Sequence, residues 1–235
     1  MVGFTAIGKG LLGVPGLIVL FQITPVTAVG SMAVAGFVMM LSGTVQHYRA
    51  GNVVAPVAVL FSATAVPASY LGARLADDLN AILPLEIIIG VLIVLSAGLL
   101  FYRYVVVRAR PRELKIEGWQ LGLSPVAGLI LGLLMGATSI SGSIIVIVFI
   151  MLLKLPSPHA VGTTSVTAAV SLLIGSVAHL QEGNVDWVVV ASLTPGVLVG
   201  AALGATYADR VPRQVLRVAI LILLVVAGGV LCLNR

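Results

Sequence analysis

Charged residues are scarce in this chain. Only 9% of its 235 residues are charged, whereas a soluble domain typically carries about 25%. Hydrophobic residues make up 60% of the sequence, and its mean hydropathy is +1.18. A water-soluble core of this size could not bury so much apolar surface. The composition therefore excludes an ordinary soluble domain and predicts that lipid surrounds most of the chain.

Residues that support cross-links or common catalytic chemistry are also few. The one cysteine, Cys232, excludes an intrachain disulfide. The three histidines lie far apart in the sequence, at His47, His159 and His179. The chain has neither a Gly-x-Ser-x-Gly motif nor a Walker-type phosphate loop. We therefore expect no metal, no cofactor and no enzyme; the nearest candidate catalytic pair, Ser141 with Lys9, makes an intramembrane enzyme a minor alternative.

The net charge of +5 comes from basic residues in short connecting segments. Such residues set the orientation of membrane segments, whereas a nucleic-acid surface needs them gathered on one face. We therefore expect a multi-pass protein of the cell inner (plasma) membrane. Its partners would be the lipid bilayer and a small solute, and not nucleic acid.

Eight apolar runs are long enough to cross a bilayer, because a spanning helix needs about 20 mostly apolar residues. They cover about 3–21, 25–46, 53–76, 84–105, 120–153, 157–180, 186–208 and 212–233. Between the fourth and fifth runs lies a polar stretch rich in arginine. We therefore divide the chain into a first transmembrane repeat at 1–105, a basic cytoplasmic linker at 106–118 and a second transmembrane repeat at 119–235.

The two halves resemble each other at an offset of 132 residues, without a gap. The offset superimposes His47 on His179 and Asp77 on Asp209. It also superimposes 28–31 on 160–163, 51–53 on 183–185 and 71–73 on 203–205. Polar residues and glycines match in one register, which shared hydrophobicity alone would not produce. We infer an all-α integral membrane protein built from two tandem homologous repeats of about four segments each.

The basic residues bear on how the two repeats are oriented. If all eight segments crossed the membrane, the arginines at 210–217 would lie on the opposite side from the basic linker, against the positive-inside tendency. If the fifth segment folds back, both basic groups share the cytoplasmic side. The acidic loops at Asp77–Asp78 and at 182–186 then face outside.

Glycine and hydroxyl residues provide such a break at 136–143, and Gly8-Lys9-Gly10 is the equivalent in the first half. A broken or re-entrant first segment leaves an odd number of crossings in each repeat. We therefore predict inverted repeats, as in many secondary transporters. Two parallel four-helix units are the alternative.

Three features resemble the TauE/SafE sulfite exporter family, also called the 4-toluene sulfonate uptake permease family. They are the glycine-rich first segment of each half (8–15 and 139–143), the small-residue stretch 28–31 with its copy 160–163, and the loop 47–53 with its copy 179–185. The resemblance covers nearly the whole chain. The family usually shows a denser glycine cluster at 8–10, and a Gly-x-Gly where this chain has Ser141-Gly142-Ser143.

The resemblance implies export or uptake of small sulfur oxyanions or organosulfonates, such as sulfite, thiosulfate and sulfoacetate. We expect an exporter that works by alternating access between its two repeats. An anion channel, or a transporter of another small organic anion, is the alternative.

A broken helix could bind such an anion, because its free N–H groups and positive dipole end attract negative charge. The candidate substrate-binding residues beside the break are Thr138, Ser139, Ser141 and Ser143. Lys9 lies at the equivalent break in the first half; alternatively it extends to the membrane interface. Further candidates are Ser31, Thr163 and Thr164, although at least one hydroxyl of 163–165 should bond back to a preceding carbonyl.

Two other patterns have a structural and a functional interpretation. His47 and His179 are candidate gating or proton-linked residues, since histidine titrates near physiological pH. The simpler interpretation is that they cap helices before a Gly-Asn turn. Two glycine stripes, at 128–136 and 196–204, predict close helix packing, either within the monomer or between the protomers of a homo-oligomer.

Overall fold

The computed structural model describes residues 9–105, 113–140, 142–207 and 213–233. These residues form helices and short connections, with no strand among them. The helices are α2 (Lys9–Phe21), α3 (Pro25–Arg49), α4 (Ala55–Arg74), α5 (Ala76–Ile82), α6 (Leu85–Val105), α7 (Gly118–Thr138), α8 (Gly142–Met151), α9 (Ser157–Gln181), α10 (Trp187–Tyr207) and α11 (Arg213–Leu233).

Five of the described helices contain a stretch long and apolar enough to cross a membrane. These stretches are Pro25–Arg49, Ala55–Arg74, Leu85–Tyr102, Gly118–Thr138 and Ser157–Gln181. Shorter apolar stretches occur in α8, α10 and α11. The prediction of a helical, multi-pass membrane protein is confirmed by this set of elements.

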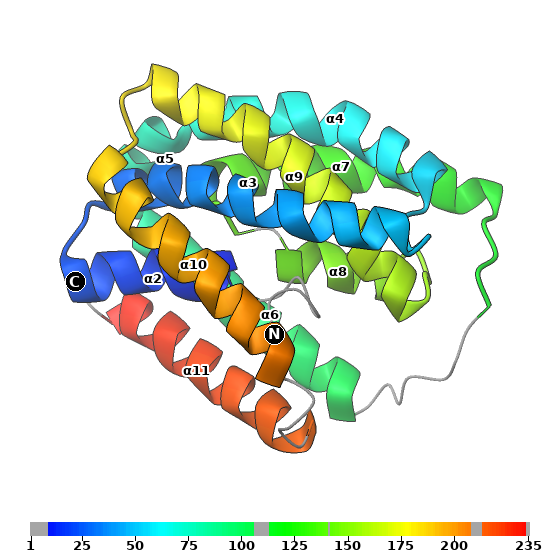
Figure 1. Ribbon diagram of the computed structural model, residues 1–235. Coiled ribbons are helices and arrows are strands. Elements are labelled where there is room, and N and C mark those ends of the chain that lie inside the picture. Colours follow the sequence, from blue (N-terminus) through cyan, green and yellow to red (C-terminus); the bar gives the residue numbers. More distant parts are fainter. Residues whose placement is uncertain (1–8, 106–112, 141, 208–212, 234–235) are drawn as a thin grey trace.

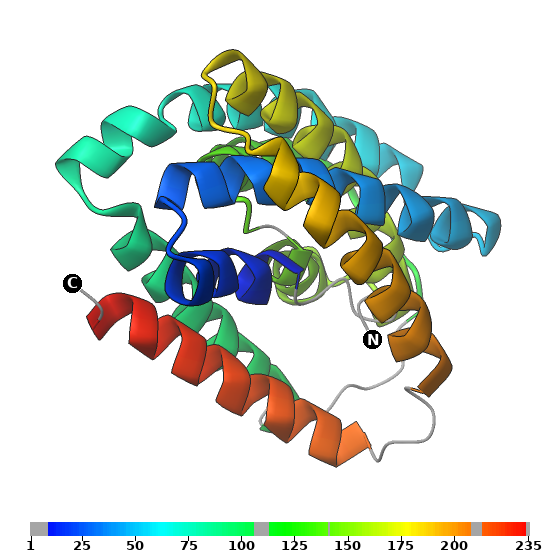
Figure 2. The same ribbon diagram turned by 60° about the vertical axis from the view of Figure 1, so that its left-hand side comes forward.

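The helices run between two ends of the molecule (Figure 1). We call one the linker end; it holds the loop 50–54, the start of α7 and the loop 152–156. We call the other the acidic end; it holds the connection 22–24, the segment 75–85 and the loop 182–186. In both ribbon views α2 and α8 lie in the middle, with α3, α4, α7 and α9 on one side and α6 and α11 on the other (Figure 2).

The central pair, α3 and α9, is antiparallel. Near the start of α9, a Cβ on Gly162 would overlap the Asn52 carbonyl, which follows the end of α3. Near the start of α3, a Cβ on Gly30 would overlap the Asn184 carbonyl, which follows the end of α9. Each helix therefore begins where the other ends, and glycine at both positions permits the close approach.

The bounds of α3 and α9 repeat the 132-residue offset seen in the sequence. Both α3 and α9 have 25 residues, and each bound of α9 lies 132 residues after the matching bound of α3. The residue that precedes each helix by three, Gln22 or Lys154, has the same φ of 55°. Residues 132 positions apart in these segments therefore have similar backbone geometry.

The two helices also end in the same way. Gly51 has a φ of 69° and Gly183 a φ of 75°, a left-handed conformation that glycine adopts at little cost. Asn52 N–H donates to the His47 carbonyl over 3.0 Å, and Asn184 N–H donates to the His179 carbonyl over 2.9 Å. This is the hydrogen-bond pattern of the Schellman motif, which satisfies carbonyls at a helix end.

The predicted break within 136–143 is present. Helix α7 ends at Thr138, Ser139 takes a left-handed φ of 56°, and α8 begins at Gly142. The chain then returns toward its starting point, since the Gln120 amide at the start of α7 donates to the Leu153 carbonyl over 2.7 Å. The segment from α7 to α8 therefore begins and ends at the linker end.

The sequence predicted a loop at Asp77 and Asp78. This prediction is wrong, because both residues lie in the short helix α5. Both aspartates occupy its first turn. Acidic side chains there are stabilised by the positive end of the helix dipole, so the residues that suggested an exposed loop also favour a helix start.

The glycine stripe at 128–136 packs against α4 within the monomer. A Cβ on Gly128, Gly132 or Gly136 would overlap the backbone of Phe61, Ala65 or Ser69, respectively. Small residues allow such backbone contact where no hydrophobic force drives two helices together. In the stripe at 196–204, Gly196 has no heavy atom within 4 Å of a Cβ position, and the side-chain positions of 200 and 204 lie outside the described part.

The buried apolar residues form two clusters, and α8 contributes to both. Val146 and Phe149 join a cluster with α4, α7 and α9, whereas Ile147 joins one with α2, α3, α6 and α11. Helix α8 is therefore enclosed by protein on two sides.

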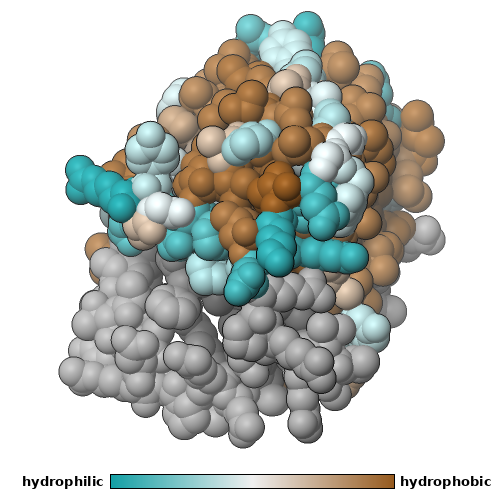
Figure 3. All heavy atoms as spheres, turned by 90° about the vertical axis from the view of Figure 1, so that its right-hand side faces the viewer, coloured by the Kyte–Doolittle hydropathy of each residue, from teal (hydrophilic) through white to brown (hydrophobic). Residues whose placement is uncertain are grey.

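On the outside, apolar side chains cover much of the described surface that faces the viewer at the linker end, and hydrophilic residues form a band across it (Figure 3).

The α4–α7 contact gives a first prediction. Gly132→Val should lower the free energy of unfolding by about 2 kcal/mol or more, because its side chain would overlap backbone that cannot move aside. Thermal denaturation of the purified protein in detergent measures the effect. Gly122→Val on the same helix is the control, since no heavy atom of the described residues lies within 4 Å of its Cβ position. Equal destabilisation by both variants would contradict the packing.

Candidate functional site

The helix break is lined by buried polar residues. Thr138 is fully buried, and Ser139 and Ser143 are 4% and 1% exposed. The Thr138 hydroxyl donates to the Leu134 carbonyl over 2.6 Å, one turn earlier in α7, and accepts the Ile140 N–H over 3.4 Å. The break is thus held partly by side-chain hydrogen bonds, in place of the backbone bonds that an unbroken helix would make.

Helix α8 begins inside the protein, at Gly142 and Ser143, both buried. It has ten residues and no acidic residue in its first turn. The N–H groups of a first turn have no partner within their own helix, and together they carry a partial positive charge. The start of α8 therefore offers hydrogen-bond donors within a buried polar region.

Three buried hydroxyls on α8 and α9 have no hydrogen-bond partner among the described residues: those of Ser143, Thr164 and Ser171. A buried polar group without a partner costs about 1–3 kcal/mol, and such groups are uncommon in proteins. Ser143 lies in the first turn of α8, and α8 packs against α9, which carries Thr164 and Ser171. These hydroxyls therefore have hydrogen-bonding capacity that the described residues do not use.

Thr164, Ser171 and Gly175 share one face of α9. Ser171 and Gly175 follow Thr164 by 7 and 11 residues, which returns to nearly the same direction in an α-helix. Ser171 accepts the Ser69 hydroxyl at its carbonyl over 2.9 Å. A Cβ on Gly175 would lie 4.0 Å from the Gly136 Cα, just before the break. This face of α9 therefore meets α4 and the end of α7.

Thr163 and Ser31 hold the loops of the opposite half. The Thr163 hydroxyl accepts the Val54 N–H over 3.0 Å, and the Ser31 hydroxyl accepts the Asp186 N–H over 3.0 Å. Both pairs are related by the 132-residue offset. These two predicted site residues thus make the same loop contact at opposite ends of the α3–α9 pair. We call this pair of contacts the reciprocal clasp.

The remaining predicted residues divide into two groups. Ser165 donates to the Val161 carbonyl over 3.0 Å, which confirms that one hydroxyl of 163–165 bonds back within its helix. Ser141 and the side chain of Lys9 lie outside the described residues. The backbone of Lys9 begins α2.

The two histidines differ in their surroundings. His179 is fully buried, and its Nε2 lies 2.9 Å from the Gly136 carbonyl oxygen, close to the break. His47 is only partly buried near the end of α3. Within the described residues, no three His, Cys, Asp or Glu residues are grouped closely enough to hold a metal ion.

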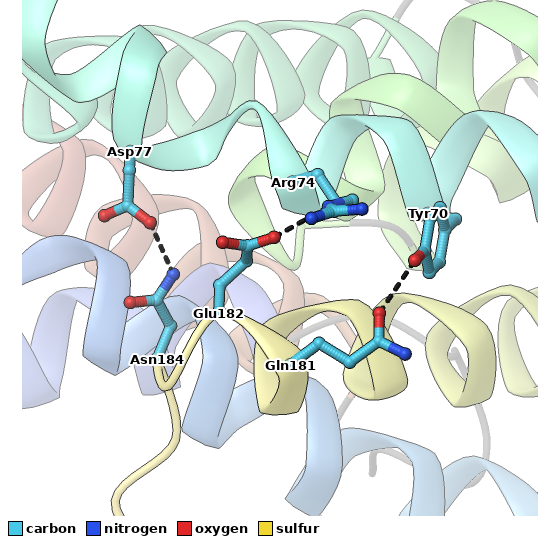
Figure 4. A network of polar contacts seen from close by, with 6 residues as sticks. All are labelled: Tyr70, Arg74, Asp77, Gln181, Glu182 and Asn184. Atoms are coloured by element: carbon cyan, nitrogen blue, oxygen red, sulfur yellow. Dashed lines mark hydrogen bonds and ion pairs between the residues drawn. The ribbon is translucent and has the colours of Figure 1, made fainter.

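A polar network joins the two halves at the acidic end (Figure 4). The Arg74 guanidinium pairs with the Glu182 carboxylate at 2.7 Å, and the Asn184 amide donates to the Asp77 carboxylate over 2.7 Å. The Tyr70 hydroxyl also donates to the Gln181 side chain over 2.7 Å. The 132-residue offset relates Arg74 and Glu182 to Thr206 and Ala50, which cannot form an ion pair. The Arg74–Glu182 contact is therefore specific to one end.

A cavity of about 230 Å³ lies at the acidic end and is separate from the predicted site. Its lining consists of Ile18, Gln22, Ile23, Thr24, Pro25, Glu86 and Leu231. It includes none of the predicted substrate-binding residues.

Comparison with known proteins identifies the family. A family model described as "Sulfite exporter TauE/SafE" matches residues 1–231. The chain belongs to the TauE/SafE sulfite exporter family. Two proteins of Bacillus subtilis (strain 168) are 28% identical to it, the "Probable membrane transporter protein YdhB" and the "Probable membrane transporter protein YjnA".

The match to YdhB covers 97% of this chain and 93% of the relative, and the match to YjnA covers 94% and 92%. A third B. subtilis relative, the "Probable membrane transporter protein YunE", is 25% identical, with 94% of this chain and 89% of the relative covered. No solved structure matches the chain. The family and the relatives together make this chain a TauE/SafE membrane transporter.

Sequence reasoning missed Ser171 and the contact between His179 and Gly136. Ser171 carried a signal, since it follows Thr164 by seven residues on the same helix face. The histidine contact joins residues 43 positions apart on helices α7 and α9. No local sequence pattern identifies such a pair.

A variant that removes the Thr163 contact of the reciprocal clasp distinguishes a structural role of Thr163 from a binding role. Thr163→Val keeps the side-chain shape but leaves the buried Val54 N–H without its acceptor. We expect the free energy of unfolding to fall by about 1–3 kcal/mol, measured by thermal denaturation, with an unchanged KM for the transported substrate. Ser31→Ala should act similarly. Thr194→Val is the control, because the Thr194 hydroxyl donates within its own helix. A raised KM with unchanged stability would assign Thr163 to the binding site instead.

Proposed function

We propose that this transporter exports small sulfur-containing anions, such as sulfite, thiosulfate or organosulfonates, and binds them at the start of α8. One observation carries the proposal. Two buried hydroxyls, those of Ser143 and Thr164, have no hydrogen-bond partner among the described residues. Ser143 lies in the first turn of α8, and α8 packs against α9, which carries Thr164. Helix N-termini bind oxyanions through free N–H groups, and hydroxyls add further donors.

The charge of the buried region favours an anion over a cation. Among the described buried residues, none is Asp, Glu, Lys or Arg. A metal cation or proton site inside a membrane protein commonly uses a carboxylate. Neutral donors at a helix start can bind an oxyanion without a buried positive charge. Ser139 belongs to the same proposed site. Ser141 and the side chain of Lys9, which lie outside the described residues, stay candidates for it.

The proposed inverted arrangement is supported by the helix packing. The equivalent helices α3 and α9 run antiparallel, as expected when one repeat is turned over relative to the other. The contacts exchange in the same way, because α2 packs on α3 as α8 packs on α9, and α10 packs on α3 as α4 packs on α9. The fold-back of α7 and α8 supplies the odd number of crossings that inversion requires.

Alternating access would then expose the break to each side in turn, as the two halves move relative to each other. Basic residues such as Arg49 and Lys154 lie at the linker end, so this end would face the cytoplasm. The cell interior is negative, and each exported negative charge gains about 2.3 kcal/mol per 100 mV. Export of an anion therefore needs no coupling ion.

The proposal is tested by anion efflux from liposomes that contain the purified protein and sulfite, thiosulfate, sulfoacetate or sulfate, at a set membrane potential. We expect saturable release that increases with internal negative potential. Ser143→Ala and Thr164→Val should each raise the KM by about tenfold, because each removes one hydrogen bond to a charged ligand.

Ser176→Ala is the matched control, since the buried Ser176 hydroxyl donates to Leu172 within its own helix. Release that is not saturable, with pore-like conductance, would favour the channel alternative. Saturable release with an unchanged KM in both site variants would move the site away from α8. No release of any of the four anions would contradict the proposed substrate class.

A further inference from the structure

A helix break brings two opposite partial charges together. The last carbonyls of α7 carry a partial negative charge, and the first N–H groups of α8 carry a partial positive one. In transporters with broken helices, the positive ends face anionic groups, whereas the free carbonyls of the negative ends coordinate cations. An anion at the start of α8 is therefore repelled by the end of α7 unless those carbonyls have donors of their own.

Three carbonyls near the end of α7 have such donors. The Leu134 carbonyl accepts the Thr138 hydroxyl, and the Met135 carbonyl accepts the Ser139 N–H over 2.7 Å. The Gly136 carbonyl lies 2.9 Å from His179 Nε2. A carbonyl can only accept, so Nε2 carries the hydrogen and donates it.

The contact between His179 and Gly136 joins helices α9 and α7, which are not consecutive in the chain. His179 comes from the last turn of α9 and is fully buried. A Cβ on Gly136 would overlap the Ser69 carbonyl, so the absence of a side chain lets α4 approach this point. Gly175, one turn before His179, lies against the same region. The imidazole is therefore held at the end of α7 by close backbone packing on two sides.

We propose that His179 is a specificity-determining residue of the anion site, which neutralises the negative end of α7 so that the break accepts an anion. The inference rests on the proposed function, because it concerns the same site. His179 acts through the Gly136 carbonyl and is a positioning residue. Without its N–H, a bare carbonyl would face the break and favour a cation in place of an anion.

The test compares His179→Phe with His179→Gln in the liposome efflux assay with sulfite. Phenylalanine fills the space but donates nothing, whereas the glutamine amide can donate to the Gly136 carbonyl. We expect His179→Phe to raise the KM for sulfite by about tenfold, with a smaller change in maximal rate, because the ligand loses favourable electrostatics and not its path. His179→Gln should recover most of the wild-type KM.

Replacement of choline by sodium at constant ionic strength gives a second readout. Sodium should inhibit sulfite release by His179→Phe, through the exposed carbonyl, and leave the wild type unaffected. His159→Phe is the control, since His159 lies at the opposite end of α9. In both histidines, Nδ1 has no hydrogen-bond partner among the described residues.

Three results would contradict the proposed role of His179. An unchanged KM in His179→Phe, beside a wild type that transports sulfite, contradicts the role of His179 and leaves the proposed function intact. Equal loss of maximal rate in the Phe and Gln variants, without a change in KM, also contradicts it and indicates a purely structural contact. No sulfite release from the wild type overturns the proposed function and this inference together.

Discussion

The antiparallel contact between α3 and α9 is the constraint on which the rest of the structure depends. It requires glycine at Gly30 and Gly162, where the loop of the opposite half crosses each helix. The reciprocal clasp then satisfies a loop N–H at each end, through Ser31 and Thr163. Because a buried N–H without a partner is costly, these contacts fix how far the two helices overlap. The positions of α4 and α10, which follow the two loops, are set by the same contacts.

The helix break depends on this frame. Helix α8 is short, and it is enclosed by the two apolar clusters on either side of it. The end of α7 is held against α4 by Gly136 and against α9 by His179. A buried helix start with free donors would be unfavourable on its own. The surrounding helices keep it out of lipid, where unsatisfied backbone groups are most costly.

Much of the fold could be predicted from the sequence because its signals are local. Apolar runs gave helices such as α3 and α9 to within a few residues, and the glycine and serine residues at 136–143 marked the break. The short helix α5 was missed, since aspartates favour both loops and helix starts. Of the candidate site, the sequence indicated the hydroxyls near the break, and their role in binding stays a prediction. The sequence did not show that Thr163 would belong to the reciprocal clasp or that His179 would contact Gly136. Both contacts join residues of different helices or loops, and no single segment encodes them.

Cysteine labelling of the loops that follow α3 and α9 tests the central claim most directly, namely that the two homologous halves have opposite orientations. Ala50→Cys and Glu182→Cys occupy equivalent, exposed positions in these loops, and Cys232→Ala removes the native thiol. With a membrane-impermeant maleimide, Glu182→Cys should react in intact cells, and Ala50→Cys only after permeabilisation. Reaction of both cysteines from the same side would contradict the inverted arrangement and favour two parallel repeats.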